Sequence, residues 1–266
     1  MDIIKLIVSD IDGTLIDTNE ELKEEFHKLK NFVKENNIPF TLATGRCYDE
    51  VHDFINEFEV DLPIVVNNGA GAVKDGNFIW ETTMKASILR QAIEYADELE
   101  MVIVTSDGIS NKSYRHNDYI RNQIKKFGRY EEIYKPEGEE WDTANIQKLL
   151  IIDPLPEGRI DSVLEKLEPY KDMLNIVKYN DRSVDIMPAS TNKAEGVLNI
   201  ARILNIDLKN IMAIGDAKND IEMINMVGVG VAVSNADPKL KEVADYVCDY
   251  PNAGGVLQAV KKFYKL

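Results

Sequence analysis

The stretch "LIVSDIDGTLID", from Leu6 to Asp17, decides the fold and raises a question of chemistry. With the residues before it, it begins as a nearly continuous apolar run rich in β-branched side chains, which is typical of a strand buried on both faces. The run ends abruptly in Asp10 and Asp12, followed by a glycine and a threonine. Two like charges where a buried strand surfaces need a physical reason, because each repels the other.

Helix and strand patterns alternate beyond this stretch. Apolar residues spaced by 4, 3, 3 and 1 predict an amphipathic helix over residues 22–33. The segment "IPFTLAT" (38–44) predicts a second strand, a helix is expected over 48–58, and "LPIVVNNGA" (62–70) predicts a third strand. This alternation predicts an α/β fold, a Rossmann-like doubly wound parallel sheet with helices on both faces.

The pattern changes in the middle of the chain. A DG dipeptide between apolar flanks in "AVKDGNFIW" (72–80) predicts a hairpin, and a second hairpin is expected near residue 180. Hairpins mixed with helices indicate an inserted α+β unit over residues 84–187. The βα rhythm then returns, so residues 1–83 and 188–266 are predicted to form one discontinuous core domain.

The composition indicates a globular protein with an acidic surface. The chain has 266 residues, 44% of them hydrophobic, which is enough for a sizeable core. Its 31 Lys and Arg against 46 Asp and Glu give a formal charge of −15, and such a surface repels nucleic acids and anionic membranes. We expect no signal peptide, and the sequence has no run of about 18 apolar residues and no cysteine framework. We therefore expect a cytoplasmic protein with no nucleic-acid or membrane partner.

Four polar clusters lie where predicted strands end or a helix begins, which is the edge where open α/β sheets bind ligands. They are Asp10 with Asp12, Thr44-Gly45-Arg46, Asn192-Lys193, and "GDAKND" from Gly215 to Asp220. One Asp taken alone is better explained as a cap or turn residue. If the strands before Asp10 and Asp216 are neighbours, several carboxylates converge and need a cation, and such sites suit Mg²⁺ with a phosphate. The expected metal ligands are Asp10, Asp12, Asp216 and Asp220.

Lys193, Thr44 and Arg46 in the remaining clusters each have two interpretations. Lys193 begins a helix, where the helix dipole disfavours a cation unless a bound anion faces both. The Thr44 hydroxyl can donate a hydrogen bond to a phosphoryl oxygen or cap the next helix, and the sequence around it is compatible with both roles. Gly45 is expected to permit a close backbone approach, and Arg46 either pairs with an anionic substrate or supports its loop.

Taken together, these motifs resemble the haloacid dehalogenase superfamily. "DIDGTL" matches its first motif, DxDGT, Thr44 its second, Lys193 its third and "GDAKND" its fourth, GDxxND, in order along the whole chain. "TGR", "NNGA", "NADPKLKEVADYV" and "GGV" look like the Cof-type branch, which carries its cap domain between the second and third motifs. The branch often has Lys-Gly where this chain has Lys193-Ala194.

The resemblance implies catalytic roles for Asp10 and Asp12, the two carboxylates of the first motif. Asp10 looks like the nucleophile that forms an aspartyl-phosphate, and Asp12 like the general acid and then the general base. Residues i and i+2 of a strand share a face, which explains the spacing. True dehalogenases lack the second aspartate, so Asp12 favours phosphoryl chemistry.

The resemblance also implies the rest of the site. Mg²⁺ would be held by the Asp10 carboxylate, the Asp12 backbone carbonyl and Asp216. Asp220 and Asn219 would order the metal's waters or the substrate side of the site. Lys193 and Thr44 would stabilise charge on the transferred phosphoryl group. Substrate contacts are expected from Gly45, Arg46 and Asn219.

The predicted function is a Mg²⁺-dependent phosphatase of small phosphomonoesters, with sugar phosphates as the expected class of metabolite. The alternatives are a phosphotransferase of the phosphomannomutase type and a non-catalytic phosphosugar-binding protein. A receiver-type signalling domain also clusters Asp, Thr and Lys, but it is far shorter and has no insertion. The sequence leaves open the natural substrate and whether the protein is a monomer or a homodimer.

Overall fold

The computed structural model describes residues 3–17, 19–155 and 158–264. The chain forms two compact units. The first unit contains Met1–Gly45, His52–Ile79 and Asn192–Leu266, and the second contains Arg46–Val51 and Trp80–Thr191. The second unit overlaps the insertion expected at 84–187 but also takes in a short segment just after Gly45. The sequence-based boundaries at 83/84 and 187/188 stay a prediction about domains.

The first unit is built on a five-stranded parallel sheet with the order β15-β14-β13-β1-β2. Its strands are β1 (Leu6–Ser9), β2 (Phe40–Leu42), β13 (Ile211–Gly215), β14 (Val229–Ala232) and β15 (Tyr246–Val247). Strand β1 is central, with β13 on one side and β2 on the other, and all four of its residues are buried. The predicted buried parallel strand is therefore confirmed.

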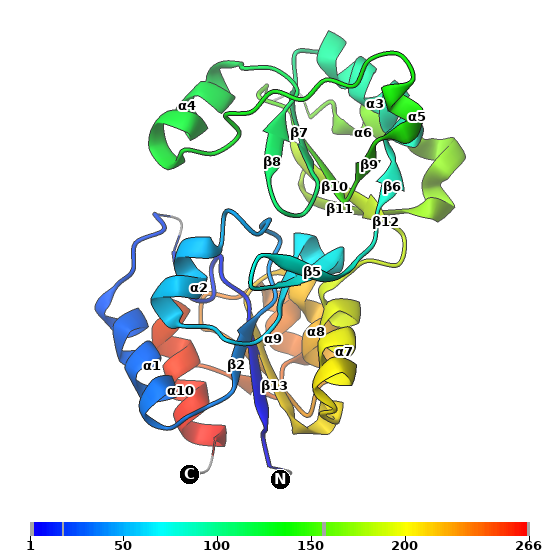
Figure 1. Cartoon of the computed structure of the whole chain (residues 1–266). Helices are drawn as coiled ribbons and strands as arrows, with labels where there is room; N and C mark the ends of the chain where they lie inside the picture. Colours follow the sequence, from blue (N-terminus) through cyan, green and yellow to red (C-terminus); the bar gives the residue numbers. More distant parts are fainter. Residues whose placement is uncertain (1–2, 18, 156–157, 265–266) are drawn as a thin grey trace. The chain divides into compact units, whose positions relative to one another are not determined.

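Helices cover both faces of this sheet, so the predicted doubly wound α/β fold is confirmed. Figure 1 shows α1 and α10 side by side on one face and α7 with α8 on the other. The helices of this unit are α1 (Glu24–Glu35), α2 (His52–Phe58), α7 (Lys193–Leu204), α8 (Ile221–Met226), α9 (Pro238–Val243) and α10 (Asn252–Phe263). Short 3₁₀ turns occupy η1 (Asn67–Gly69), η3 (Leu208–Asn210) and η4 (Lys218–Asp220).

The apolar face of α1 explains how this helix packs. Phe26, Leu29 and Val33 of the predicted face are buried, but the helix begins at Glu24, so Leu22 lies outside it and is exposed. The Phe26 ring lies edge-on to the ring of Phe58 in α2, with centroids 5.5 Å apart.

Among the described residues, no helix of either unit has the length and apolar character required to cross a bilayer.

The predicted DG hairpin is also confirmed. Strands β3 (Ile64–Val66), β4 (Gly71–Lys74) and β5 (Asn77–Glu81) form a small sheet in that order. Asp75 and Gly76 turn the chain between β4 and β5 with φ of 52° and 73°, which Asp and Gly tolerate better than most residues. A single parallel bridge from Val65 to Ala43 continues the main sheet beyond β2.

The second unit is α+β, as predicted for the insertion. Its antiparallel sheet has the order β11-β12-β10-β7-β8. The strands are β7 (Val102–Ser106), β8 (Asn111–Ser113), β10 (Lys148–Ile152), β11 (Leu174–Asn180) and β12 (Ser183–Pro188), with a separate pair β6 (Met84–Lys85) and β9 (Asn145–Ile146). The helices are α3 (Ala86–Glu98), α4 (Asp118–Phe127), α5 (Glu140–Thr143), α6 (Ile160–Leu164) and the 3₁₀ turn η2 (Glu165–Met173). Leu89 and Ile93 of α3 belong to one core with Leu149 and Ile151 of β10.

A buried carboxylate fixes the chain after β10 in this unit. Asp153 is fully buried and accepts hydrogen bonds from the backbone N–H groups of Leu155 and Arg159, each at 3.0 Å. The Arg159 guanidinium donates to both of its oxygens, at 3.0 and 2.7 Å. These bonds, the side-chain ones most of all, lower the pKa of Asp153 to about 2.

Replacing Asp153 with Asn is therefore expected to lower the free energy of unfolding by about 2–3 kcal/mol near neutral pH. The folded-state pKa lies below the unfolded one, so the wild type has this stability above about pH 4 and loses it as the pH falls toward about 2. Urea unfolding at several pH values measures the difference. An equal loss of stability at acidic and neutral pH would contradict the assignment.

Candidate active site

The predicted convergence of the first and fourth polar clusters is observed. Strands β1 and β13 are parallel neighbours, with Ser9 opposite Ile214. The chain leaves both strands at the same edge of the sheet, and the Asp10 N–H donates to the Ile214 carbonyl at 3.0 Å. Asp10 and Asp216 therefore lie at the carboxyl ends of adjacent strands, where open α/β sheets bind their ligands.

Three carboxylates meet at this edge. Asp10, Asp216 and Asp220 each offer one oxygen, and these oxygens lie within 4.8 Å of one another. Asp220 is completely buried and accepts hydrogen bonds from the backbone N–H groups of Asp216, at 3.1 Å, and Ala217, at 3.0 Å. A hard divalent cation prefers such a set of oxygens. The Asp12 side chain is exposed and lies outside this group of three, so only its predicted backbone carbonyl is a ligand candidate.

Lys193 joins two of the carboxylates. As the first residue of α7 it is almost completely buried, and its ammonium donates to Asp10 Oδ1 at 2.6 Å and to Asp220 Oδ1 at 2.7 Å. The helix begins at Asn192, whose side chain accepts the Glu195 N–H at 2.8 Å. The cap thus places the lysine, and the nearby anions account for a cation at a helix N-terminus, where the dipole alone would disfavour it.

The site is electrostatically strained without a cation. Burial raises the pKa of Asp10 well above its usual value, with Lys193 opposing the rise and the neighbouring aspartates adding to it. Burial, and next the charge of Asp220, raise the pKa of Asp216 to about 6. Burial alone would lower the pKa of Lys193, but Asp10 and Asp220 outweigh it and the pKa is raised. These shifts indicate that negative charge is in excess here.

Because negative charge is in excess at this site, we expect Mg²⁺ to stabilise the protein by an amount that depends on pH. The folded pKa of Asp216 lies above its unfolded value of 3.8, so its contribution to stability is largest below that pH and is lost as the pH rises through about 6. Adding Mg²⁺ should therefore raise the melting temperature more at about pH 7.5 than at about pH 5, where a proton competes for Asp216. Differential scanning fluorimetry with and without chelator measures this. Equal shifts at both pH values would contradict the site.

Gly13 and Thr14 shape the loop against Asp216. Gly13 has φ of +82°, and a Cβ placed on it would lie 2.2 Å from Asp216 Oδ2. The Thr14 hydroxyl donates to Asp216 Oδ1 at 2.9 Å. The glycine of the first motif is thus needed for its positive φ and for a close approach, and the threonine holds a candidate metal ligand.

The second cluster lies at the end of β2. Thr44 is completely buried, and its N–H donates to the Val65 carbonyl at 3.0 Å. Asn68, which the sequence did not single out as a site residue, donates its N–H to the Thr44 carbonyl at 2.9 Å and accepts the side-chain amide of Asn219 at 2.9 Å. A Cβ on Gly45 would lie 3.1 Å from Asn68 Oδ1. Asn68 therefore links Thr44, Gly45 and Asn219 within the first unit.

A backbone signal accompanies Asn68. Asn67, Asn68 and Gly69 have φ of 47°, 53° and 95°, so three consecutive buried residues are left-handed. Left-handed conformations in non-glycine residues are costly and persist where the surroundings enforce them. The "NNGA" stretch supplies the Asn and Gly residues that tolerate the left-handed backbone of this turn.

Arg46 groups with a different unit from the carboxylates. It belongs to the second unit, is buried, and donates to the Glu50 carbonyl at 3.3 Å. Its predicted substrate contact stays a prediction. The next residue, Cys47, is buried with its pKa raised to about 12, chiefly by burial, so it is no candidate nucleophile.

Comparison with known proteins agrees with this geometry. A family model of haloacid dehalogenase-like hydrolases matches residues 7–260. A 5-amino-6-(5-phospho-D-ribitylamino)uracil phosphatase of Bacillus subtilis is 26% identical over 97% of this chain and 95% of its own. A phosphoglycolate phosphatase of Methanosarcina acetivorans is 27% identical over the same shares.

The fold has a solved counterpart as well. The crystal structure of a haloacid dehalogenase-like hydrolase from Bacteroides thetaiotaomicron matches with a TM-score of 0.83 at 24% identity, covering 97% of this chain and 99% of that one. The resemblance inferred from the motifs is confirmed. The chain therefore belongs to the haloacid dehalogenase-like hydrolases, and by class it is a phosphoric monoester hydrolase, the class for which the two relatives above are named.

Proposed function

We propose that this protein is a Mg²⁺-dependent phosphatase of small phosphorylated metabolites, with sugar phosphates as the substrate class, acting through an aspartyl-phosphate on Asp10. The observation that supports it most is the meeting of Lys193 with Asp10 and Asp220 beside Asp216. An ammonium and three carboxylates at one strand edge can bind a metal ion and a phosphate together.

In the first half-reaction a carboxylate oxygen of Asp10 forms a bond to phosphorus while the bond from phosphorus to the substrate oxygen breaks. Asp12, exposed at the end of the same segment, gives its proton to the departing alcohol. Lys193 and the Thr44 hydroxyl stabilise the charge on the phosphoryl oxygens. Gly45, Asn219 and Arg46 are proposed to contact the substrate.

In the second half-reaction Asp12 takes a proton from water, whose oxygen attacks phosphorus. The bond between phosphorus and Asp10 breaks, so phosphate leaves and the carboxylate is restored. Mg²⁺, held by Asp10, the Asp12 carbonyl and Asp216 with Asp220 behind them, would offset the repulsion between the nucleophile and the phosphate. The charge of Lys193 favours the ionised, nucleophilic form of Asp10 and opposes the rise in its pKa that burial causes.

The proposal extends to the setting of the reaction. We assign substrate selection and the exclusion of water to the inserted unit acting as a cap, with residues 84–187 as its predicted extent. The protein is proposed to work in the cytoplasm, as a monomer or homodimer. The two relatives described above are named for different substrates, so they support the reaction class and leave the leaving group to experiment.

A phosphate-release assay tests the proposal. Purified protein is given a panel of sugar phosphates, nucleotides, phosphoglycolate and the ribitylaminouracil phosphate, with Mg²⁺ or with chelator. We expect free phosphate that stops on chelation and returns with Mg²⁺. Transfer of phosphate to a second sugar would favour the phosphotransferase alternative. Absence of release from the whole panel would favour a binding protein.

A further inference from the structure

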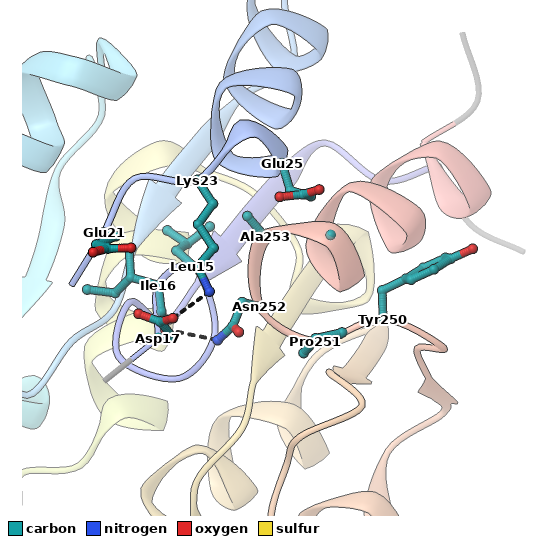
Figure 2. A pocket seen from close by; sticks show the side chains of 11 residues that line it. Leu15, Ile16, Asp17, Glu21, Lys23, Glu25, Tyr250, Pro251, Asn252 and Ala253 are labelled. Carbon is teal, nitrogen blue, oxygen red and sulfur yellow. Dashed lines mark hydrogen bonds and ion pairs between the residues drawn. The ribbon is translucent and has the colours of Figure 1, made fainter. Parts of the chain in front are cut away.

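Two asparagines near the end of the chain hold the loop that follows β1. Asn252, the first residue of α10, donates from Nδ2 to the carbonyls of Gly13 and Ile16, each at 2.9 Å. Asn235 donates to the same Gly13 carbonyl at 2.8 Å, and its own oxygen accepts the Asn252 N–H at 3.2 Å. We call Asn235 and Asn252 the asparagine clamp. Figure 2 shows Asn252 beside Ile16 and Asp17 in the wall of a cavity of about 270 Å³.

The clamp acts on the peptide that carries the Asp12 carbonyl. The Gly13 N–H donates to the Ile16 carbonyl at 2.8 Å, and the same carbonyl is held by Asn252. The peptide between Asp12 and Gly13 is planar and trans, so fixing the direction of its N–H fixes the opposite direction of its C=O. Asn252 thereby sets where the Asp12 carbonyl, the proposed ligand, points.

The loop also has little room to move on its other side. Gly13 lies so close to Asp216 that an added Cβ would overlap the carboxylate. Thr14, one residue further, donates to that same carboxylate. A shift of the clamped carbonyls would therefore change the spacing between Asp10 and Asp216 as well as the direction of the Asp12 peptide.

The backbone at Asn252 favours this interpretation. Its φ is +48°, in the left-handed region where glycine carries the smaller penalty. A glycine would fit this backbone but would supply neither of the two hydrogen bonds. The asparagine side chain is therefore what the site gains from this position.

We infer that Asn252 is a positioning residue for the phosphoryl-transfer loop, holding the Asp12 carbonyl and the Asp10–Asp216 spacing through the carbonyls of Gly13 and Ile16. This inference rests on the proposed function. Asn252 is assigned no contact with the substrate or the reacting atoms. It acts through the loop, as residues behind metal ligands do, and changing such residues typically costs 10- to 100-fold in metal affinity or activity, by order of magnitude.

The test is Asn252→Gly, which removes the clamp donor and keeps the left-handed backbone free of strain. Because Asn252 is half-buried in a cavity wall, water can replace its amide and the fold should persist. Mn²⁺ binding, followed by electron paramagnetic resonance of the free ion, should weaken by about tenfold or more. With phosphate release as the second readout, kcat should fall while KM changes by less than about threefold.

Asn205→Gly is the matched control. Asn205 also has a left-handed φ, +53°, in the same unit, but it is an exposed residue at the end of α7. It should leave both readouts at wild-type values. If Asn252→Gly does not fold, Asn235→Ala removes the other donor to Gly13 and is measured in the same way.

The outcomes separate the two claims. Wild-type protein that binds Mn²⁺ and releases phosphate, with Asn252→Gly indistinguishable from Asn205→Gly, overturns the positioning role alone. Wild-type protein that binds Mn²⁺ without releasing phosphate overturns the proposed function, and the Mn²⁺ comparison still decides the clamp. Wild-type protein that binds no Mn²⁺ overturns both.

Discussion

Asp10→Asn is expected to lower the turnover number by at least about 10³-fold while the protein remains folded. The amide cannot act as the attacking carboxylate, so the covalent step is lost. Folding should survive because the change removes one of three converging negative charges, and Lys193 keeps its bond to Asp220. Phosphate release and urea unfolding measure the two effects.

Asp75→Asn is the control for this variant. Asp75 is exposed in the hairpin turn of the same unit and has φ of 52°, which Asn tolerates well. It changes the net charge by the same amount and should leave turnover unchanged. Full activity of Asp10→Asn would exclude Asp10 as the nucleophile.

Lys193→Met is expected to damage both stability and turnover. The lysine is the buried partner of Asp10 and Asp220, and removing one partner of a buried ion pair typically costs about 3–5 kcal/mol. Asp10 already has a raised pKa, so protonation favours the folded state and the loss should be larger at about pH 7.5 than at about pH 5. Turnover should fall by at least about 10²-fold, since the proposed donor to the phosphoryl group is gone.

Lys209→Met serves as the comparison for Lys193→Met. Lys209 has a largely exposed side chain in the same unit, 3.9 Å from Asp207, and exposed pairs of this kind contribute little. Its loss should change the free energy of unfolding by less than about 1 kcal/mol. Equal stability losses for the two variants, or a loss at Lys193 that is independent of pH, would contradict the electrostatic account.

Much of the core fold was predictable because its strands and helices carry strong apolar patterns. Strand β1, the part of the run from Leu6 to Ser9, is buried along its whole length. Helix α1 begins at Glu24 and buries Phe26, Leu29 and Val33 of the predicted face, whereas Leu22 lies before the helix and is exposed. The adjacency of β1 and β13 was different. These strands are about 200 residues apart, and their pairing depends on tertiary packing, so the sequence supported it only as a condition for the metal site.

The middle of the insertion shows where pattern reasoning fails. The stretch after Gly108, up to about Trp141, is polar and weakly patterned and gives no predicted element, yet it contains β8 and α4. Helix α4 buries only Ile120, but Ile120, Ile124 and Phe127 have helical spacing, so this short apolar face within a polar stretch was missed. Its end signals were present: Asn117 caps it by accepting the Ile120 N–H, and Gly128 ends it with φ of 67°.

The helix expected over 48–58 begins later, at His52. The N–H groups of Tyr48 and Asp49 donate to the carbonyls of Gly108 and Ile109, each at 2.9 Å. These long-range backbone bonds use groups that a helix would need. No local sequence pattern predicts these hydrogen bonds. They explain why the segment after Gly45 groups with the second unit.

In the site, the ionisable residues were predictable and their supports were not. The sequence motifs contain several ionisable residues close together, namely Asp10, Lys193, Asp216 and Asp220. Carboxylates that converge are stable only with a positive charge beside them, so these residues were predicted to meet. Asn68, Asn235 and Asn252 act through hydrogen bonds between their amide groups and backbone carbonyls or another side-chain amide. A lone asparagine in a loop is common in turns, so position in three dimensions alone distinguishes these residues.

The central claim is that Asp10 becomes phosphorylated during each turnover. Quenching a reaction of enzyme with a good substrate, then reducing the protein with borohydride, converts an aspartyl-phosphate to homoserine, which peptide mass spectrometry locates. We predict homoserine at position 10, dependent on substrate and Mg²⁺ and absent from Asp10→Asn. Release of phosphate by active enzyme with homoserine at another position, or at none, would contradict the account.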